Sequence, residues 1–267
     1  MDVDVGADLL KKITNAFAKK YDDDITISVL EARLASEKAT LEDAMTYAER
    51  VGEILANVYQ ETLSSSVLPN GKMYWNIAQK VIKEPLVNNY TLAANASMHA
   101  VDATNKRYGV NIKAQKPTLG SDRISNIANK VVQYDSYDDA AYMLGEPVKN
   151  FSRSVVDDAV HENADFQAKA GIDVKIVRTM TGRETCDWCR ARAGTYKYAD
   201  VRDTGNDVWQ RHDYCDCRIE YVSSKESYDI ENFKKTDKRK RDVSVEDDRS
   251  AEKIAQRKAI AGITERK

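Results

Sequence analysis

The sequence predicts an α+β protein that is mainly α-helical and has three consecutive regions. Over residues 1–170, apolar side chains recur every three or four positions, which predicts a helical N-terminal body. From Gly171 the period changes from 3.6 to 2, which predicts a small antiparallel β unit over residues 171–223. Residues 224–267 are polar and charged, which predicts a charged tail with one short helix.

Residues 41–62 carry the clearest helical pattern in the N-terminal body. Thr40 stands immediately before the first apolar residue, where a hydroxyl side chain commonly caps a helix. The segment is therefore expected to be an amphipathic helix with its own N-cap. The residues that recur on one face are Leu41, Ala44, Met45, Ala48, Val51, Leu55, Val58 and Thr62.

Proline, glycine and aspartate positions set the expected ends of other helices. Residues 69–71, Pro-Asn-Gly, predict a turn. The helix that follows is expected to be interrupted at Pro85, and another helix is expected over residues 86–106. Asp122 is expected to cap a helix that extends to Val132.

A long helix is expected to begin at Pro147, because proline is favoured in the first turn, and to end at Gly171. His161 lies off its apolar stripe and is expected to be solvated, and His99 is given no role. No nucleotide-binding, nucleophile-elbow or HExxH motif occurs, so the chain is expected not to be an enzyme. The stripe consists of Val148, Phe151, Val155, Ala159 and Phe166.

The β unit is expected to contain three short strands. Val174 and Ile176 alternate in the first, residues 195–198 form the second, and residues 217–222 form the third. A turn is expected where a Cys-x-x-Cys motif separates the first two strands. Trp188 and Trp209 lie on either side of this region and are expected to cover the cysteines.

All four cysteines of the chain lie between residues 186 and 217. They form Cys186-x-x-Cys189 and, after 22 intervening residues, His212-x-x-Cys215-x-Cys217. Two short pairs separated by a loop have the ligand spacing of a structural zinc site. Four such ligands would fill a tetrahedral shell, so one structural zinc per chain is predicted. This zinc knuckle would hold together a β unit that is too small for an adequate core.

Five residues compete for four ligand positions, in the expected order Cys186, Cys189, Cys215, His212 and Cys217. Side chains two apart in a strand point to the same face, so Cys215 and Cys217 are both able to complete the shell. Two disulfides, a redox Cys-x-x-Cys motif and free buried thiols are the alternatives. The free-thiol alternative applies best to Cys217, because it shares a face of the expected third strand with Ile219 and Tyr221.

Composition excludes few partners. Charged residues make up 31% of the chain and the mean hydropathy is -0.60. No run of 18 apolar residues occurs, so no membrane contact is predicted. The net charge of -2 gives no global argument for nucleic-acid binding. The acidic N-terminus is unlike a signal peptide, so synthesis in the cytoplasm with reduced cysteines is expected.

The tail differs in charge from the rest of the chain. Residues 225–267 hold 13 Lys and Arg against 10 Asp and Glu. A basic cluster in this segment is either solvated or in contact with nucleic acid or an acidic partner. Its members are Lys234, Lys235, Lys238, Arg239, Lys240 and Arg241.

Short motifs follow one another in a recognisable order over residues 147–223. They are Glu162-Asn163-Ala164, Gly171-Ile172, Arg178-Thr179, Thr185-Cys186-x-x-Cys189, Ala193-Gly194 and His212-x-x-Cys215-x-Cys217. In this order they resemble the C-terminal part of the Mu F-like head morphogenesis family, the minor head proteins of tailed bacteriophages. By this resemblance, Cys186, Cys189, His212, Cys215 and Cys217 match the family's metal-binding pattern. Asp213 and Asp216 stand where the family often has proline and arginine.

The resemblance implies a structural minor capsid protein of the virion, made in the host cytoplasm. Such a protein would associate with the portal or the major capsid protein and assist head assembly, DNA packaging or genome delivery. The basic cluster would then contact packaged DNA. Two other functions are alternatives: a zinc-containing nucleic-acid-binding protein, and a metal-dependent nuclease with His212 as general base.

Overall fold

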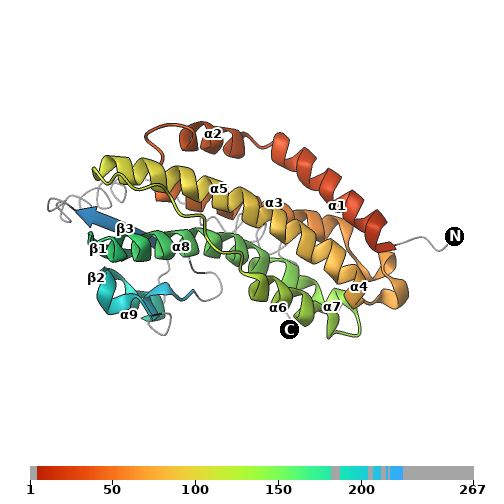
Figure 1. The fold of residues 1–267 in the computed structure, drawn as a ribbon. Helices are drawn as coiled ribbons and strands as arrows, with labels where there is room; N and C mark the ends of the chain where they lie inside the picture. Colours follow the sequence, from red (N-terminus) through yellow and green to blue (C-terminus); the bar gives the residue numbers. More distant parts are fainter. Residues whose placement is uncertain (1–4, 182–186, 204–206, 212–214, 216, 225–267) are drawn as a thin grey trace, which may run out of the picture. The chain divides into compact units, whose positions relative to one another are not determined.

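Three long helices, α3 (Leu41–Thr62), α5 (Glu84–Arg107) and α8 (Glu146–Lys169), pack against one another at the centre of the fold (Figure 1). This computed structural model describes residues 5–181, 187–203, 207–211, 215 and 217–224, all within one unit of residues 1–225. None of the described helices is long and apolar enough to cross a membrane. The fold is mainly helical with a small antiparallel sheet, as the sequence predicted.

Shorter helices cover the central three. Helices α1 and α2 pack on α3, and α6 packs on α4, on the π-helical turn Gln79–Lys83 and on α8. The bounds of these elements are α1 (Val5–Asp22), α2 (Ile25–Leu34), α4 (Trp75–Ala78), α6 (Ser121–Val132), α7 (Tyr137–Ala140) and the 3-10 turns Ser65–Val67, Pro69–Gly71 and Ala141–Leu144.

Helix α3 begins as the sequence predicted. The Thr40 hydroxyl accepts a hydrogen bond from the backbone N–H of Asp43, and the Asp43 carboxylate accepts one from the backbone N–H of Thr40. This reciprocal capping box satisfies two backbone donors that the helix itself leaves unpaired. The predicted stripe is buried except at Thr62, and Val51, Leu55 and Val58 are fully buried. Burial extends beyond the stripe to residues such as Tyr47, Ile54 and Tyr59, because α3 packs against both α5 and α8.

The predicted interruption at Pro85 is wrong. Helix α4, a π-helical turn (Gln79–Lys83) and α5 follow one another without a gap, and Pro85 lies in the first turn of α5. Proline lacks an N–H and its ring collides with the carbonyl four residues earlier in a regular α-helix. The wider π turn directly before it changes this spacing, so the chain continues in a helical path.

The predicted cap at Asp122 is also wrong. The N-cap of α6 is Gly120, which makes no side-chain capping bond, and Asp122 lies inside the first turn. An acidic side chain is still favourable there because it faces the positive end of the helix dipole.

Helix α8 has the predicted ends. Pro147 lies in its first turn, and Gly171, with φ of 80°, follows its last residues. Val148, Phe151, Val155 and Ala159 are buried as expected, but Phe166 is 45% exposed. The buried face turns towards Asn163, Ala164 and Gln167 in the last turns. There α8 packs against the sheet, α5 and an extended segment, so the apolar stripe no longer marks the core side.

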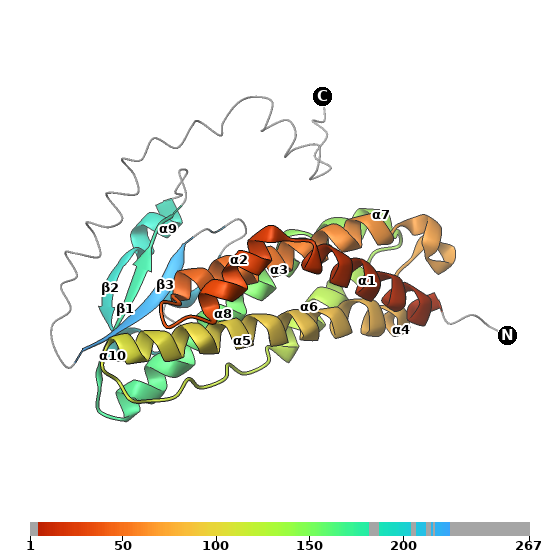
Figure 2. The same ribbon diagram turned by 90° about the horizontal axis from the view of Figure 1, so that it is seen from above.

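The sheet has the strand order β2-β1-β3, with both pairs antiparallel. Its strands are β1 (Asp173–Thr179), β2 (Gly194–Lys197) and β3 (Arg218–Ser224). They lie at the opposite end of the central helices from α4 and α7 (Figures 1 and 2). Val174, Ile176, Ile219 and Tyr221 belong to the same buried core as the helices.

Three local expectations in the β unit are wrong. The segment after the first cysteine is not a turn but a short helix, α9 (Asp187–Arg192). The second strand is one residue earlier than predicted, because Gly194 pairs with Arg178 and Tyr198 already begins α10 (Tyr198–Val201). The third strand begins one residue later and ends two residues later than predicted, so Cys217 directly precedes it.

Candidate metal centre

Cys189, Cys215 and Cys217 bring their sulfur atoms together at one buried point. The three Sγ atoms lie within 4.8 Å of one another, and those of Cys189 and Cys215 are 3.8 Å apart. The side chains are 4%, 1% and 3% exposed, respectively. The group is therefore shielded from water and could hold a metal ion.

The topology of the sheet brings these residues together. Cys189 lies on α9, which connects β1 to β2, whereas Cys215 and Cys217 lie immediately before β3. Because β1 and β3 are neighbours, the end of β1 and the start of β3 lie at the same edge, where Thr179 pairs with Arg218. Met180 and Trp188 pack against the three cysteines and complete a small apolar shell.

The distances fit a metal better than a disulfide. A zinc–thiolate bond is about 2.3 Å long, so two thiolates on a tetrahedral ion lie about 3.8 Å apart. The sulfur atoms of a disulfide are about 2.05 Å apart. Cys189 and Cys215 have the first spacing, and all three described cysteines are free. Three sulfur donors leave one position of a tetrahedral shell to another residue.

The structure places some predicted ligands and not others. Cys189, Cys215 and Cys217 come together, so Cys217 belongs to the cluster although the sequence ranked it last. The predicted ligands Cys186 and His212 lie outside the described residues. Outside them, too, are the predicted helix of the tail and the basic cluster Lys234, Lys235, Lys238, Arg239, Lys240 and Arg241.

Trp188 covers the cysteines as predicted, but Trp209 does not. Two arginine side chains lie against the Trp188 ring, with the guanidinium carbon of Arg192 3.9 Å and that of Arg178 5.2 Å from its centre. Trp209 packs edge-on against His161, with ring centres 4.5 Å apart. His161 is therefore not simply solvated, and its Nε2 lies 3.0 Å from the carbonyl oxygen of Arg202.

Arg178 of β1 reaches from the sheet to the cysteines. Its side chain is 1% exposed, and it donates to the carbonyl oxygens of Val208 (2.5 Å) and Gln210 (2.8 Å). Its second terminal nitrogen lies 3.8 Å from Cys215 Sγ. A buried cation in contact with sulfur favours the thiolate over the thiol.

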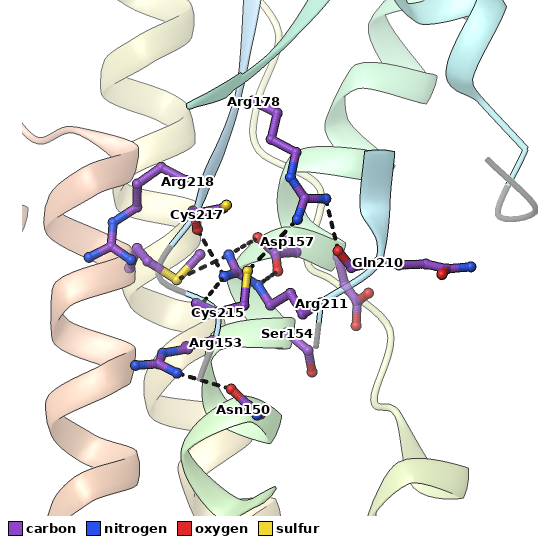
Figure 3. Close-up of polar contacts among 12 residues, drawn as sticks. Asn150, Arg153, Ser154, Asp157, Arg178, Gln210, Arg211, Cys215, Cys217 and Arg218 are labelled. Carbon is purple, nitrogen blue, oxygen red and sulfur yellow. Dashed lines mark hydrogen bonds and ion pairs between the residues drawn. The ribbon is translucent and has the colours of Figure 1, made fainter. Parts of the chain in front are cut away.

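Arg211 holds the other side of the cysteine pair (Figure 3). It forms a two-point ion pair with Asp157 of α8, in which the Nη2–Oδ1 distance is 2.9 Å. Its Nη1 donates to the carbonyl oxygens of Cys217 (2.8 Å) and Cys215 (3.3 Å). One guanidinium group therefore joins the cysteine segment to a central helix.

The cysteines polarise one another in the absence of a metal. The hydrogen bond with the Cys217 thiol lowers the pKa of Cys215 to about 4, helped by the charge of Arg211 and opposed by burial. The same hydrogen bond, together with burial, raises the pKa of Cys217. Within this pair, the thiolate form is therefore favoured at Cys215 and the thiol form at Cys217, and metal binding would release the proton of Cys217.

A second ion-pair group lies beside the first. Glu49 of α3 accepts hydrogen bonds from Arg218, which begins β3, and from Arg153 of α8 at 3.1 Å. Arg153 also donates to Glu146 (2.8 Å) and Asn150 (3.0 Å). Helices α3 and α8 therefore supply carboxylates to the arginines that precede and follow Cys215 and Cys217 in the sequence: Asp157 pairs with Arg211, and Glu49 pairs with Arg218.

Sequence reasoning missed Asp157, Arg211 and Glu49. Charged residues on amphipathic helices are usually solvated, and nothing in the local pattern marks Glu49 of α3 as half-buried or Asp157 of α8 as buried. The one available indication was the position of Arg211, directly before a candidate ligand. Its pairing with Asp157 could not be predicted, because it forms only when the segment before β3 packs on α8.

The motif Glu162-Asn163-Ala164 has a structural role. The Asn163 side chain bonds both the N–H (2.7 Å) and the carbonyl (2.9 Å) of Gln115, and Glu162 accepts from the N–H of Thr118 at 2.8 Å. These bonds hold the extended segment before α6 against α8, so the motif fixes a backbone path.

No protein-family model, curated protein or solved structure matches this chain. The class that the fold and site define is therefore a mainly helical protein with a small sheet and a buried three-cysteine cluster.

Proposed function

We propose that the cysteine cluster holds one structural zinc ion and that the chain serves as a minor head protein of a tailed bacteriophage. The observation that carries the first part is the convergence of three buried sulfur atoms at the spacing of a tetrahedral thiolate site. Either Cys186 or His212 would supply the fourth ligand, since both are close in sequence to members of the cluster.

Zinc is favoured over other ions by the donor chemistry. Soft thiolate ligands select zinc, copper(I) or iron–sulfur clusters, whereas magnesium, calcium and manganese prefer oxygen. A complete shell of protein ligands leaves no position for a reacting water, which makes the ion structural. The ion would join α9 to the segment before β3, which are 26 residues apart at Cys189 and Cys215.

The minor head function is supported by the resemblance over residues 147–223. The described motifs that carry the resemblance occur, in chain order, near the end of α8, around β1, in α9, at the start of β2 and directly before β3. A rigid unit with a closed metal site suits a role in assembly, in which surfaces have to keep a fixed geometry. The partners would be the portal or the major capsid protein, and the location would be the phage head.

Metal analysis of the full chain tests the zinc proposal. Protein purified without chelator is expected to contain about one zinc per molecule. The matched control is Cys189→Ser, which removes one ligand from the described cluster and is expected to reduce the zinc content sharply. Wild-type protein that contains no metal, or contains iron instead, would contradict the proposal.

Quantitative mass spectrometry of density-purified particles tests the minor head proposal. This chain would be counted against portal and major capsid protein in particles of the source phage or induced prophage. A low and reproducible copy number near that of the portal is the expected result. Absence from both mature heads and proheads would contradict the proposal and would direct attention to the nucleic-acid-binding and nuclease alternatives.

A further inference from the structure

Asp157 and Arg211 form a buried ion pair between the helical body and the cysteine segment. Their side chains are 7% and 8% exposed, respectively. Asp157 lies in the middle of α8, and Arg211 lies four residues before Cys215. A buried charge pair of this kind is stable only while both partners are present and their remaining donors and acceptors are satisfied.

The remaining donors of Arg211 are satisfied by the backbone carbonyl groups of Cys215 and Cys217. Two of its nitrogens, Nε and Nη2, face the Asp157 carboxylate, and Nη1 faces the carbonyl oxygens of Cys215 and Cys217 (Figure 3). A guanidinium group is planar and rigid, so fixing one side with a carboxylate fixes the direction of the other. The backbone positions of two candidate ligands therefore depend on a carboxylate that touches neither sulfur.

We infer that Asp157 is a positioning residue for the metal site and sets its metal affinity through Arg211. This inference rests on the proposed metal site, because it concerns the ligands Cys215 and Cys217. Without the carboxylate, the buried Arg211 cation would have to leave its position or recruit water, and the two carbonyls would lose a fixed donor. The metal would then bind to ligands that have to be ordered first.

The same helix offers a matched control. Asp158, the next residue on α8, also forms a two-point ion pair with an arginine, Arg123 of α6, with one N–O distance of 3.0 Å. Its partner lies on a helix of the body and not in the cysteine segment. Asp157→Asn and Asp158→Asn therefore remove the same chemical group from one helix, and only the first affects the metal-site backbone.

The test is zinc affinity of the full-length chain, measured by competition with a chromophoric chelator. Substitutions of residues that orient metal ligands commonly reduce affinity about 10–100-fold, and Asp157→Asn is expected to fall in this range. Asp158→Asn is expected to stay within about threefold of wild type, because it lies away from the ligands. The visible spectrum of the cobalt(II)-substituted protein should change in Asp157→Asn and stay the same in Asp158→Asn.

Equal zinc affinity in wild type and Asp157→Asn would overturn the inference, and so would equal losses in the two variants. If Asp157→Asn loses its helical circular dichroism, Arg211→Lys decides the matter. Lysine keeps the charge opposite Asp157 but lacks the fork that reaches both carbonyls, so weaker zinc binding is expected and unchanged binding would overturn the inference. Failure of the wild type to bind zinc would instead refute the proposed metal site.

Discussion

The hydroxyl of Tyr221 donates a 2.7 Å hydrogen bond to the Oδ1 atom of Asn105, which joins β3 to α5 inside the core. The same oxygen accepts a 2.8 Å hydrogen bond from Nε2 of Gln167 on α8, whose own oxygen accepts from Ser223. All four side chains are buried, with exposures of 1% or less. The side-chain oxygen of Asn105 therefore accepts two hydrogen bonds and connects α5, α8 and β3, which are far apart in the sequence.

Replacing Tyr221 with phenylalanine is expected to lower the free energy of unfolding by about 1 kcal/mol. The ring keeps its packing, and Oδ1 of Asn105 keeps the bond from Gln167, so only one buried hydrogen bond is lost. Urea unfolding measures the effect. Tyr142→Phe is the control, since Tyr142 is 60% exposed and a change of less than about 0.5 kcal/mol is expected there. Equal effects of the two substitutions would contradict this account of the network.

At Gly52, α3 and α8 approach each other closely. A Cβ atom at this position would lie 2.9 Å from the Cα atom of Lys149 and 2.9 Å from Oγ of Ser152. Alanine would gain about 1 kcal/mol in helix propensity over glycine. Because the nearest atom belongs to the backbone of α8, the two helices would have to separate, and such overpacking costs about 1–3 kcal/mol.

Gly52→Ala is therefore expected to destabilise the protein by about 1 kcal/mol net, in spite of the propensity gain. The control is Asn95→Ala, at an exposed position of α5, where alanine should be neutral or slightly stabilising. Thermal unfolding compares the two variants. A Gly52→Ala protein more stable than wild type would show that α3 and α8 are not in close contact at this point.

Local features of the chain were predictable because their physics is local. The Thr40 cap and the stripe of α3 follow from residues within one or two turns, as do Pro147 at the start of α8 and Gly171 after it. Pro85 was mispredicted because the π turn before it is not encoded by a simple period. Periodicity reports which residues are apolar, but it does not report where a helix changes its packing partners.

The sequence predicted that cysteines form the candidate site, but it did not predict which of them come together or which charged residues hold them. Spacing nominated Cys189, Cys215 and, in last place, Cys217. That Cys217 joins the other two depends on where β3 begins and how it pairs with β1. The ion pair of Asp157 and Arg211 joins residues 54 positions apart. No local pattern encodes such a contact, because it exists only when the sheet has packed on α8.

Removal of residues 225–267 is expected to leave the melting temperature almost unchanged and to remove from the circular dichroism only the signal of the short helix expected in the tail. Residues 1–225 form one unit with its own core, and β3 ends at Ser224. If the basic cluster of the tail, Lys234 to Arg241, contacts DNA, the truncated protein should bind DNA more weakly and with a smaller dependence on salt concentration. Full-length protein with the six basic residues changed to glutamine is the matched control. DNA binding that does not depend on salt would contradict an electrostatic contact.

Single substitutions should identify the zinc ligands. Cys217→Ser is expected to lower zinc affinity at least about 10-fold, because Cys217 belongs to the buried cluster and a hydroxyl is a poor ligand for zinc. Loss of metal should also lower the melting temperature, since binding energy at such sites is largely folding energy.

Cys186→Ser and His212→Ala then decide the fourth position. One of the two is expected to weaken zinc binding as strongly as Cys217→Ser, and the other to have a much smaller effect, because a tetrahedral shell with three cluster thiolates has one position left. Chelator competition on the full-length chain measures all three variants. If Cys217→Ser binds zinc like wild type while both other variants fail, the shell consists of Cys186, Cys189, His212 and Cys215, and Cys217 is a buried thiol beside it.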